Sequence, residues 1–368
     1  MEHERFMQEA LRLAKQGEGF VEPNPMVGCV IVQNQQIIAQ GFHSQFGKAH
    51  AEIEALRNAA GTDLTGATLY VTLEPCSHHG KTPPCTDALL RTGIRRIVTA
   101  MRDPNPKVNG QGLQILRNAG IEVIEDVLKD EAERLNAPYL TLVQKQRPFI
   151  ICKWSMTLDG KLATRTQHSA WISNGDSRQI VQHLRSRMDA VMTGSGTVQS
   201  DNPLLTVRLS DAERQYPRRP LRIILDSNAF VPLNSRLVQT AGQYKTLIVT
   251  GPDVNSERCK DLQQAGCELL RLKQDNPQNR LSALLAELGR RQITNLLVEG
   301  GGKLFGSLFD LGLIDEVHAF IAPKLIGGEK AVPVFGGSGV AKLPLAAVLK
   351  SPVIQTVGSD VYVRGRLK

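Results

Sequence analysis

EPCSHHGKTPPC at residues 74–85, preceded by HAE at residues 50–52, decides the fold of the amino-terminal half. His50 opens an expected helix, Cys76 follows an expected strand, and Cys85 opens a second expected helix. One imidazole and two thiolates form a soft set of three ligands that suits zinc and leaves a fourth position for water. A helix start also favours a thiolate, because the helix dipole lowers the pKa of the thiol.

A zinc site of this kind needs a separate group that moves protons. Zinc lowers the pKa of its bound water, but another side chain must carry the proton away. Glu52 lies two residues after His50 and can do this without binding the metal. We therefore expect Glu52 to be catalytic. The alternatives are a structural zinc site or a pair of core cysteines; a closed structural site would need a fourth protein ligand and would leave Glu52 without a role.

The order H-x-E, then P-C, then a further cysteine resembles the zinc nucleoside deaminases. Their second half is usually P-C-x-x-C, whereas eight residues separate Cys76 from Cys85 here. The longer spacing resembles the deaminase half of the bifunctional riboflavin-biosynthesis enzymes. That resemblance implies that Asn24, His78 and Lys81 contact the substrate. A lysine suits a phosphate and an asparagine can read a pyrimidine edge; solvated loop positions are the alternative.

Strand and helix patterns alternate through the first 145 residues. VGCVIV at residues 27–32 is a buried-strand pattern, and HAEIEALRNAA at residues 50–60 is helical. Such an alternation predicts a sandwiched α/β sheet. The resemblance implies, more narrowly, a cytidine-deaminase-like three-layer α/β/α domain.

A second α/β series follows a segment with two prolines and several polar residues, NAPYLTLVQKQRP at 136–148. We expect the domain boundary there, with a zinc deaminase domain at 1–145 and a reductase domain at 146–368. In the second half, Ser173 and Asp176 have the spacing of a capping box for a helix.

EGGGKLFGS at residues 299–307 follows an expected strand and opens an expected helix. Backbone amides at a helix start bind phosphate, and glycine permits a close approach. The spacing is not G-x-G-x-x-G and no acidic residue ends a strand about 20 residues later, so a Rossmann dinucleotide fold is disfavoured. A plain tight turn is the alternative.

Five segments resemble, in order, the reductase half of the same riboflavin-biosynthesis enzymes, so that the resemblance covers nearly the whole chain. They are KWSMTLDGKLA (153–163), SAWIS (169–173), GSGTVQSDNPLLTVR (194–208), LDS (225–227) and VEGGGKLFGS (298–307). This half is similar to dihydrofolate reductases, which implies a dihydrofolate-reductase-like α/β fold that uses NADPH.

The resemblance also implies two sets of contacts. The cofactor contacts are Ser155, Trp171, Thr197, Asp201, Ser227, Gly301, Gly302, Lys303, Leu304, Phe305, Gly306 and Ser307. The substrate contacts are Ser169, Arg185, Leu205, Arg208 and Glu299. Two arginines suit a phosphate, which they bind through paired hydrogen bonds. Alternatives remain: Trp171 as ordinary core, Asp201 within a simple turn, and Lys153 either facing the ribose or extending to solvent.

The implied function is a bifunctional enzyme of riboflavin biosynthesis. Its first domain deaminates 2,5-diamino-6-ribosylamino-4(3H)-pyrimidinone 5′-phosphate, and its second reduces the ribosyl group with NADPH to give 5-amino-6-ribitylamino-uracil 5′-phosphate. One rival is a nucleic-acid-editing zinc deaminase with an accessory domain, although no basic run or aromatic stacking stripe supports it. An inactive binding protein is a second rival, which the intact set of His50, Glu52, Cys76 and Cys85 disfavours.

Composition agrees with these expectations. The chain has 368 residues, 41% of them hydrophobic, and a net charge of +8 from 44 basic and 36 acidic residues. It has no run of about 20 apolar residues, and its 6 cysteines in so long a chain do not make a disulfide framework. We expect a cytoplasmic homo-oligomer, dimer or tetramer, that takes small pyrimidine ribosyl phosphates and has neither nucleic-acid nor membrane partners.

Overall fold

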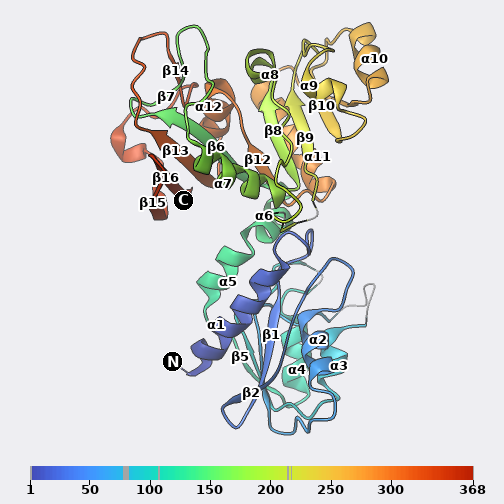
Figure 1. Ribbon diagram of the computed structural model, residues 1–368. Coiled ribbons are helices and arrows are strands. Elements are labelled where there is room, and N and C mark those ends of the chain that lie inside the picture. The colour runs from blue at the N-terminus through green and yellow to red at the C-terminus, as the bar shows by residue number, and fades with distance from the viewer. Residues whose placement is uncertain (1, 78–82, 107, 214, 217, 368) are drawn as a thin grey trace. The chain divides into compact units, whose positions relative to one another are not determined.

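The computed structural model describes residues 2–77, 83–106, 108–213, 215–216 and 218–367 (Figure 1). The chain divides into two compact units, Met1–Gln146 and Arg147–Lys368. Among the described residues, no helix is both long enough and apolar enough to cross a membrane.

The first unit is built on a five-stranded sheet of order β2-β1-β3-β4-β5 within the described residues. β1 pairs antiparallel with β2 and with β3, whereas β3, β4 and β5 are parallel. The strands are β1 (Gly28–Gln33), β2 (Gln36–Phe42), β3 (Thr68–Val71), β4 (Arg96–Thr99) and β5 (Glu122–Ile124). The helices are α1 (Glu2–Ala14), α2 (Ala51–Asn58), α3 (Cys85–Leu89), α4 (Gln111–Asn118), α5 (Lys129–Leu135) and α6 (Ala137–Lys145), with the short turn η1 (Lys15–Gly17).

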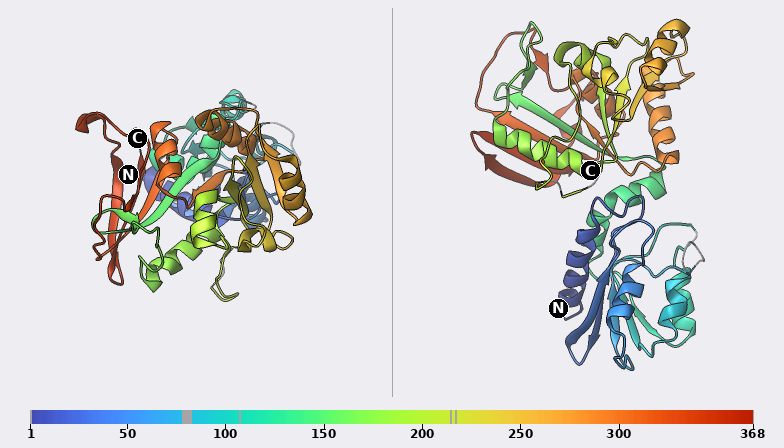
Figure 2. Two further views of the ribbon diagram at one scale, coloured as in Figure 1. Left: turned by 90° about the horizontal axis from the view of Figure 1, so that it is seen from above. Right: turned by 45° about the vertical axis from the view of Figure 1, so that its right-hand side comes forward.

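Two glycines let helices pack closely on opposite faces of this sheet. Gly28 lies opposite Phe42, and the next pair joins Cys29 to Gly41, so the two glycines face opposite sides. A Cβ on Gly28 would lie 1.9 Å from a carbonyl oxygen of α1, and one on Gly41 would lie 2.4 Å from a backbone nitrogen of α2. Figure 2 shows α1 and α2 on either side of the strands. The predicted layered α/β sandwich is confirmed.

The segment expected to hold the domain boundary is mostly helical. α6 begins at Ala137, and Pro138 lies in its first turn, where a missing N–H leaves no helical hydrogen bond unmade. The buried Asn136 accepts from the Met26 N–H at 2.8 Å and donates to its carbonyl at 2.9 Å, which ties this end of the unit to the start of β1. The division into units falls between Gln146 and Arg147.

The second unit contains a nine-stranded sheet of order β11-β10-β9-β8-β12-β6-β13-β16-β15 in the part of the chain that the structure describes. The first seven strands in that order are parallel, and the terminal hairpin β15–β16 joins β13 antiparallel. The strands are β6 (Phe149–Thr157), β8 (Ala190–Gly194), β9 (Leu221–Leu225), β10 (Thr246–Thr250), β11 (Glu268–Arg271), β12 (Asn295–Val298), β13 (Glu316–Ala322), β15 (Leu349–Val357) and β16 (Asp360–Leu367); β7 (Lys161–Ala163) pairs with β14 (Val332–Pro333).

Helices cover both faces of this sheet. They are α7 (Gly175–Ser186), α8 (Ser195–Asp201), α9 (Arg236–Gln239), α10 (Ser256–Gln264), α11 (Pro277–Arg290) and α12 (Gly302–Asp310), with a short turn η2 (Leu343–Leu345). Apolar residues of α11 and α12 share one core with Ile150 and Cys152 of β6, whereas Val181 of α7 packs with Phe320 of β13. β6 therefore presents Lys153 to the face that α7 covers, because successive side chains of a strand alternate.

The expected capping box at Ser173 is wrong. The N-cap of α7 is Asn174, whose side-chain oxygen accepts the Ser177 N–H at 2.8 Å. Asn174 also donates to the carbonyl of Val357 at 2.6 Å. This second contact ties the helix start to the C-terminal hairpin, and the local spacing of residues could not have indicated it.

Replacing Gly28 with alanine should destabilise the first unit, because the new Cβ would overlap a backbone oxygen of α1. Overpacking of a core costs about 1–3 kcal/mol, and a backbone neighbour cannot move aside as a side chain can. Urea unfolding of the full-length chain measures the change. Gly242→Ala is the control, because a Cβ there has no neighbour within 4 Å. Equal stability of both variants would contradict the packing argument.

Candidate active sites

Three soft donors of the first unit converge on one point. The His50 Nδ1 lies 3.5 Å from the Cys76 Sγ and 3.3 Å from the Cys85 Sγ, and all three donor atoms lie within 4.8 Å of one another. Tetrahedral zinc, with bonds of about 2.1 Å to nitrogen and 2.3 Å to sulfur, holds such donors about 3.6 Å apart. The donor set and its spacing therefore fit zinc.

Helix starts position these donors. His50 is the N-cap of α2, and Cys85 is the first residue of α3. The backbone N–H of Cys85 donates to the Cys76 sulfur at 3.3 Å. The hydrogen bond between the two thiols lowers the pKa of Cys76 and raises that of Cys85.

Glu52 lies in the first turn of α2 and is 3% exposed. Burial, followed by the negative charge of Cys76, raises the pKa of Glu52 to about 7. The sequence order H-x-E thus places one carboxyl group beside the donor set without making it part of that set.

His43, which no sequence motif indicated, orients the side chain of Asn24. The His43 Nδ1 lies 2.9 Å from the carbonyl oxygen of Ala49, so this nitrogen carries the proton and the Nε2 accepts from the Asn24 amide at 3.2 Å. Burial lowers the pKa of His43, which favours this neutral form. The amide oxygen of Asn24 is then the atom it can offer to a ligand. His43 stands alone at the end of β2, next to no motif that could have indicated it.

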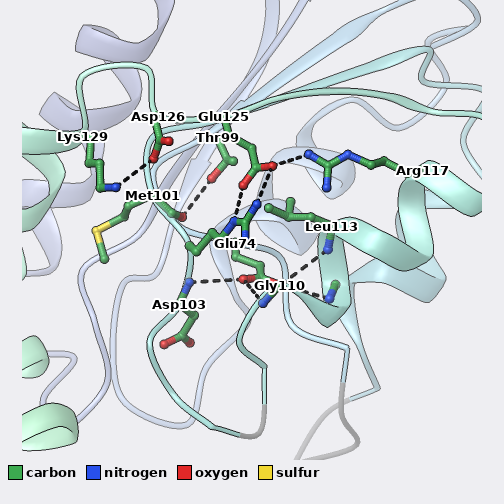
Figure 3. A network of polar contacts seen from close by, with 12 residues as sticks. Glu74, Thr99, Met101, Asp103, Gly110, Leu113, Arg117, Glu125, Asp126 and Lys129 are labelled. Atoms are coloured by element: carbon green, nitrogen blue, oxygen red, sulfur yellow. Dashed lines mark hydrogen bonds and ion pairs between the residues drawn. The ribbon is translucent and has the colours of Figure 1, made fainter.

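A buried carboxylate fixes the backbone just before Cys76. Glu74, 4% exposed, accepts the backbone N–H groups of Asp103 at 3.2 Å, Gly110 at 2.9 Å and Gly112 at 3.0 Å (Figure 3). These donors come from the start of α4 and the loop before it. No motif marks Glu74 for this role, because its partners lie 29 to 38 positions away. Two further expected substrate contacts, His78 and Lys81, lie outside the described residues.

A buried ion cluster lies on the α7 face of the second sheet. Arg185 contacts Glu299 through two hydrogen bonds, Nε to Oε1 at 2.5 Å and Nη2 to Oε2 at 2.9 Å, and the Lys153 Nζ lies 3.4 Å from Oε2. Burial raises the pKa of Glu299, but the charges of Arg185 and Lys153 outweigh it and lower this pKa to about 2. Lys153 therefore does not extend to solvent. The guanidinium group of Arg185 binds Glu299, a carboxylate of the protein itself.

Side chains hold the segment that carries Leu205 and Arg208. Its carbonyl at Thr206 accepts from Arg185 at 3.2 Å, and its N–H at Arg208 donates to Gln182 at 2.8 Å. Leu205 is buried and has a left-handed backbone, φ 52°. The Arg208 guanidinium is exposed, so of the two arginines expected to bind phosphate it is the accessible one.

Asp201 is the last residue of α8, and the chain turns at Asn202, whose backbone is left-handed. Its Oδ1 accepts a hydrogen bond from the Ser169 hydroxyl at 2.9 Å. One expected cofactor contact and one expected substrate contact are thus joined directly. The ordinary-core alternative for Trp171 is wrong, because 71% of this residue is exposed.

The glycine-rich segment has two separate roles. Gly301 caps α12, and a Cβ there would meet only the Thr197 hydroxyl, at 3.8 Å, so this position is open. Cβ atoms on Gly302 and Gly306 would lie 2.6 and 2.3 Å from backbone oxygens of residues 333 and 336, so these two glycines permit backbone packing.

Phe305 is fully buried against Trp154. Leu304 packs against the same core, Lys303 lies in the first turn of α12, and the Ser307 hydroxyl donates to the Lys303 carbonyl at 3.1 Å.

The remaining expected cofactor contacts lie along one edge of the sheet. Ser155 lies near the carboxyl end of β6, Thr197 follows β8, Gly301 follows β12 and Ser227 follows β9. These strands are neighbours in the order β9-β8-β12-β6 and run parallel, so their carboxyl ends share one edge. Such an edge is where open α/β sheets bind ligands.

Two protein families match this chain. The RibD C-terminal domain matches residues 148–363, and the cytidine and deoxycytidylate deaminase zinc-binding region matches residues 1–101. The riboflavin biosynthesis protein RibD of Actinobacillus pleuropneumoniae is 43% identical over 97% of this chain and 93% of its own length. The RibD of Escherichia coli is 41% identical over 98% of both chains.

Solved structures agree over the full length. RibD of Acinetobacter baumannii is 35% identical with a TM-score of 0.84, covering 100% of this chain and 99% of that one. A Thermotoga maritima protein described as a diaminohydroxyphosphoribosylaminopyrimidine deaminase and 5-amino-6-(5-phosphoribosylamino)uracil reductase is 38% identical, with a TM-score of 0.84 and the same coverage. The predicted fold classes of both halves are confirmed.

Glu299→Gln should destabilise the second unit strongly, because it leaves Arg185 and Lys153 as buried cations without their counter-charge. Breaking a buried pair in this way costs about 3–5 kcal/mol. The folded-state pKa of Glu299 is lowered to about 2, so its contribution is present above about pH 4.5 and is lost as the pH falls toward 2. Calorimetry from pH 7 downward measures both effects.

The exposed pair Glu268–Arg291 provides the control. Glu268→Gln should change stability by no more than about 1 kcal/mol. A stability gap between wild type and Glu299→Gln that stays constant between pH 5 and pH 2 would contradict the assignment of the charge to Glu299.

Proposed function

Because the chain belongs to the RibD family of riboflavin-biosynthesis proteins, we propose that its first unit deaminates at the His50–Cys76–Cys85 site and that its second unit reduces at the carboxyl edge of the nine-stranded sheet. The chain is a bifunctional deaminase and reductase of riboflavin biosynthesis. The convergence of three zinc-type donors beside a buried glutamate is the observation that carries the assignment of the first activity.

The substrates follow from the Thermotoga maritima relative, which is described as acting on a diaminopyrimidine and a uracil that both carry a phosphoribosylamino group. We assign the same pair to this chain. The first unit removes the exocyclic amine of 2,5-diamino-6-ribosylamino-4(3H)-pyrimidinone 5′-phosphate. The second unit then reduces the ribosyl group of the product to ribityl.

In the deaminase, each residue has a separate task. Zinc, when bound by His50, Cys76 and Cys85, supplies a Lewis acid that lowers the pKa of water. Glu52, buried and two residues from His50, would accept a proton from the attacking water and donate a proton to the departing amine. The amide oxygen of Asn24, oriented by His43, accepts a hydrogen bond from an N–H of the pyrimidine edge.

In the reductase, the protein mainly orients two ligands, and the nicotinamide cofactor supplies the hydride. The exposed Arg208 binds the substrate phosphate. Glu299 accepts one hydrogen bond from a substrate hydroxyl at Oε1, because Arg185 and Lys153 together occupy three of the four lone pairs of its carboxylate. The hydrogen bond between Ser169 and Asp201 joins one proposed substrate contact to one proposed cofactor contact.

We assign NADPH as that cofactor. Arg280 donates to the Ser227 hydroxyl at 3.1 Å, which places a cation beside one proposed cofactor contact. An arginine there can bind the 2′-phosphate that distinguishes NADPH from NADH through charge-assisted hydrogen bonds. Steady-state kinetics with both cofactors, on wild type and Arg280→Met, decide the assignment.

Cys85→Ser should lose both zinc and deamination, because a hydroxyl is a poor replacement for a thiolate ligand. Glu52→Gln should keep zinc and lose about 10²–10⁴-fold in deaminase turnover, the usual contribution of general acid–base catalysis. Metal analysis and product mass spectrometry measure the two effects. Reductase turnover on the deaminated substrate is the internal control in both variants. Full deaminase activity in a zinc-free preparation would refute the metal assignment, and full activity of Glu52→Gln would refute the proton-transfer role.

We also propose that the chain forms a homo-oligomer, a dimer or a tetramer. Several large apolar side chains of the second unit are exposed, and a contact between copies would cover them. They are Leu325, Leu343, Leu345, Val348 and Ile354. None of the six cysteines, all of them among the described residues, forms a disulfide, which agrees with the proposed location in the reducing cytosol.

Sedimentation should then give a mass of at least twice the 40.4 kDa of one chain. Ile354→Lys should reduce that mass, because a charge in an apolar interface is costly to desolvate. Ile37→Lys, at an exposed position of the first unit, is the matched control and should not change it. A wild-type chain that sediments as a monomer at micromolar concentration would contradict the proposal.

A further inference from the structure

Trp171 has an unusual backbone conformation. Its φ is 63°, in the left-handed region that bulky residues seldom occupy, and 71% of the residue is exposed. Burial of its own side chain therefore does not hold it in place. A non-glycine residue stays in this conformation only when surrounding contacts fix it, and such residues cluster at ligand sites.

One lysine supplies these contacts. The Nζ of Lys324 donates to the carbonyl of Trp171 at 2.6 Å and to that of Ile172 at 3.0 Å. An ammonium group that binds two successive carbonyls fixes the direction of both peptide planes, because each carbonyl must point toward the same nitrogen.

The loop that carries Lys324 is itself well anchored. Its backbone carbonyl accepts the Leu158 N–H at 2.8 Å, in the turn after β6. The Asp159 carboxylate accepts the N–H groups of Ile326 at 3.3 Å and Gly327 at 2.8 Å. Lys324 therefore reaches Trp171 from a fixed base at the carboxyl end of β6 and β13, where the proposed cofactor contacts lie.

The indole ring is covered on one side. The guanidinium carbon of Arg178 lies 4.5 Å from the ring centroid, and its Nη1 donates to the Ser173 carbonyl at 2.7 Å. Because the ring nonetheless remains exposed, its other face is available. A planar aromatic ring of a ligand would gain stacking energy there.

We propose that Lys324 is a positioning residue, which holds the Trp171 ring as a stacking platform for a planar ring of the nicotinamide cofactor. The inference rests on the proposed cofactor role of Trp171. Lys324 acts through the backbone of Trp171, because its ammonium group is directed at main-chain carbonyls.

The test uses the full-length enzyme with NADPH as the probe. Lys324→Met keeps the length of the side chain but removes the donor, and should weaken NADPH binding roughly five- to tenfold in calorimetry without substrate. The KM for NADPH should rise by a similar factor, whereas the KM for the deaminated pyrimidine substrate and the deaminase turnover should stay at wild-type values. Lys324→Arg, which still donates to both carbonyls, should restore most of the affinity.

Lys245→Met is the matched control. It removes the same charge from an exposed lysine just before β10, at the amino ends of the parallel strands, and should leave NADPH binding unchanged. A loss in this variant equal to that in Lys324→Met would mean that net charge alone is responsible, and would overturn the proposal.

Trp171→Ala distinguishes the cofactor role of Trp171 from the positioning role of Lys324. If Trp171→Ala binds NADPH as tightly as wild type, the cofactor role of Trp171 fails and the inference fails with it. If Trp171→Ala weakens binding but Lys324→Met does not, only the positioning role is wrong. The expected result is that Lys324→Met adds no further loss to Trp171→Ala, because both changes remove the same platform. Additive losses would show that Lys324 acts independently of Trp171.

Discussion

Unpaired backbone N–H groups at the starts of helices organise the chemistry of both units. The first turn of every helix leaves such groups without partners inside the helix. In the first unit, the start of α3 gives its N–H to the Cys76 sulfur, and Glu74 accepts the donors at the start of α4. In the second unit, Thr197 and Gly301 lie at the starts of α8 and α12. The zinc donors His50 and Cys85 and the proposed cofactor contacts Thr197 and Gly301 lie at helix starts, where unpaired backbone donors are available.

The sequence was sufficient where a motif of fixed residue types and spacing marked the site. The spacing of His50, Glu52, Cys76 and Cys85 indicated a zinc site, and the structure brings the three donors together as expected. Alternating strand and helix patterns also predicted layered α/β folds, because periodicity reports which face of an element is buried.

Contacts across long separations were not predictable in this way. Lys153, Arg185 and Glu299 come from three elements, and only the parallel register of β6 and β12 makes two of them neighbours. His43 has no motif around it. Its role, to orient the side-chain amide of Asn24, depends on a contact nineteen positions away. The expected capping residue was wrong for a similar reason, since Asn174 is selected partly by its contact with the C-terminal hairpin.

Gly28 and Gly41, at the open end of the hairpin β1–β2, constrain how that hairpin can form. Gly28 faces α1 and Gly41 faces α2, and each helix tolerates only a hydrogen atom at its contact. A slip of one residue in the pairing of β1 and β2 would turn every side chain of the shifted strand to the opposite face. A misaligned hairpin would then place a full side chain against a helix backbone. The two helices can therefore pack only on the correctly aligned strands.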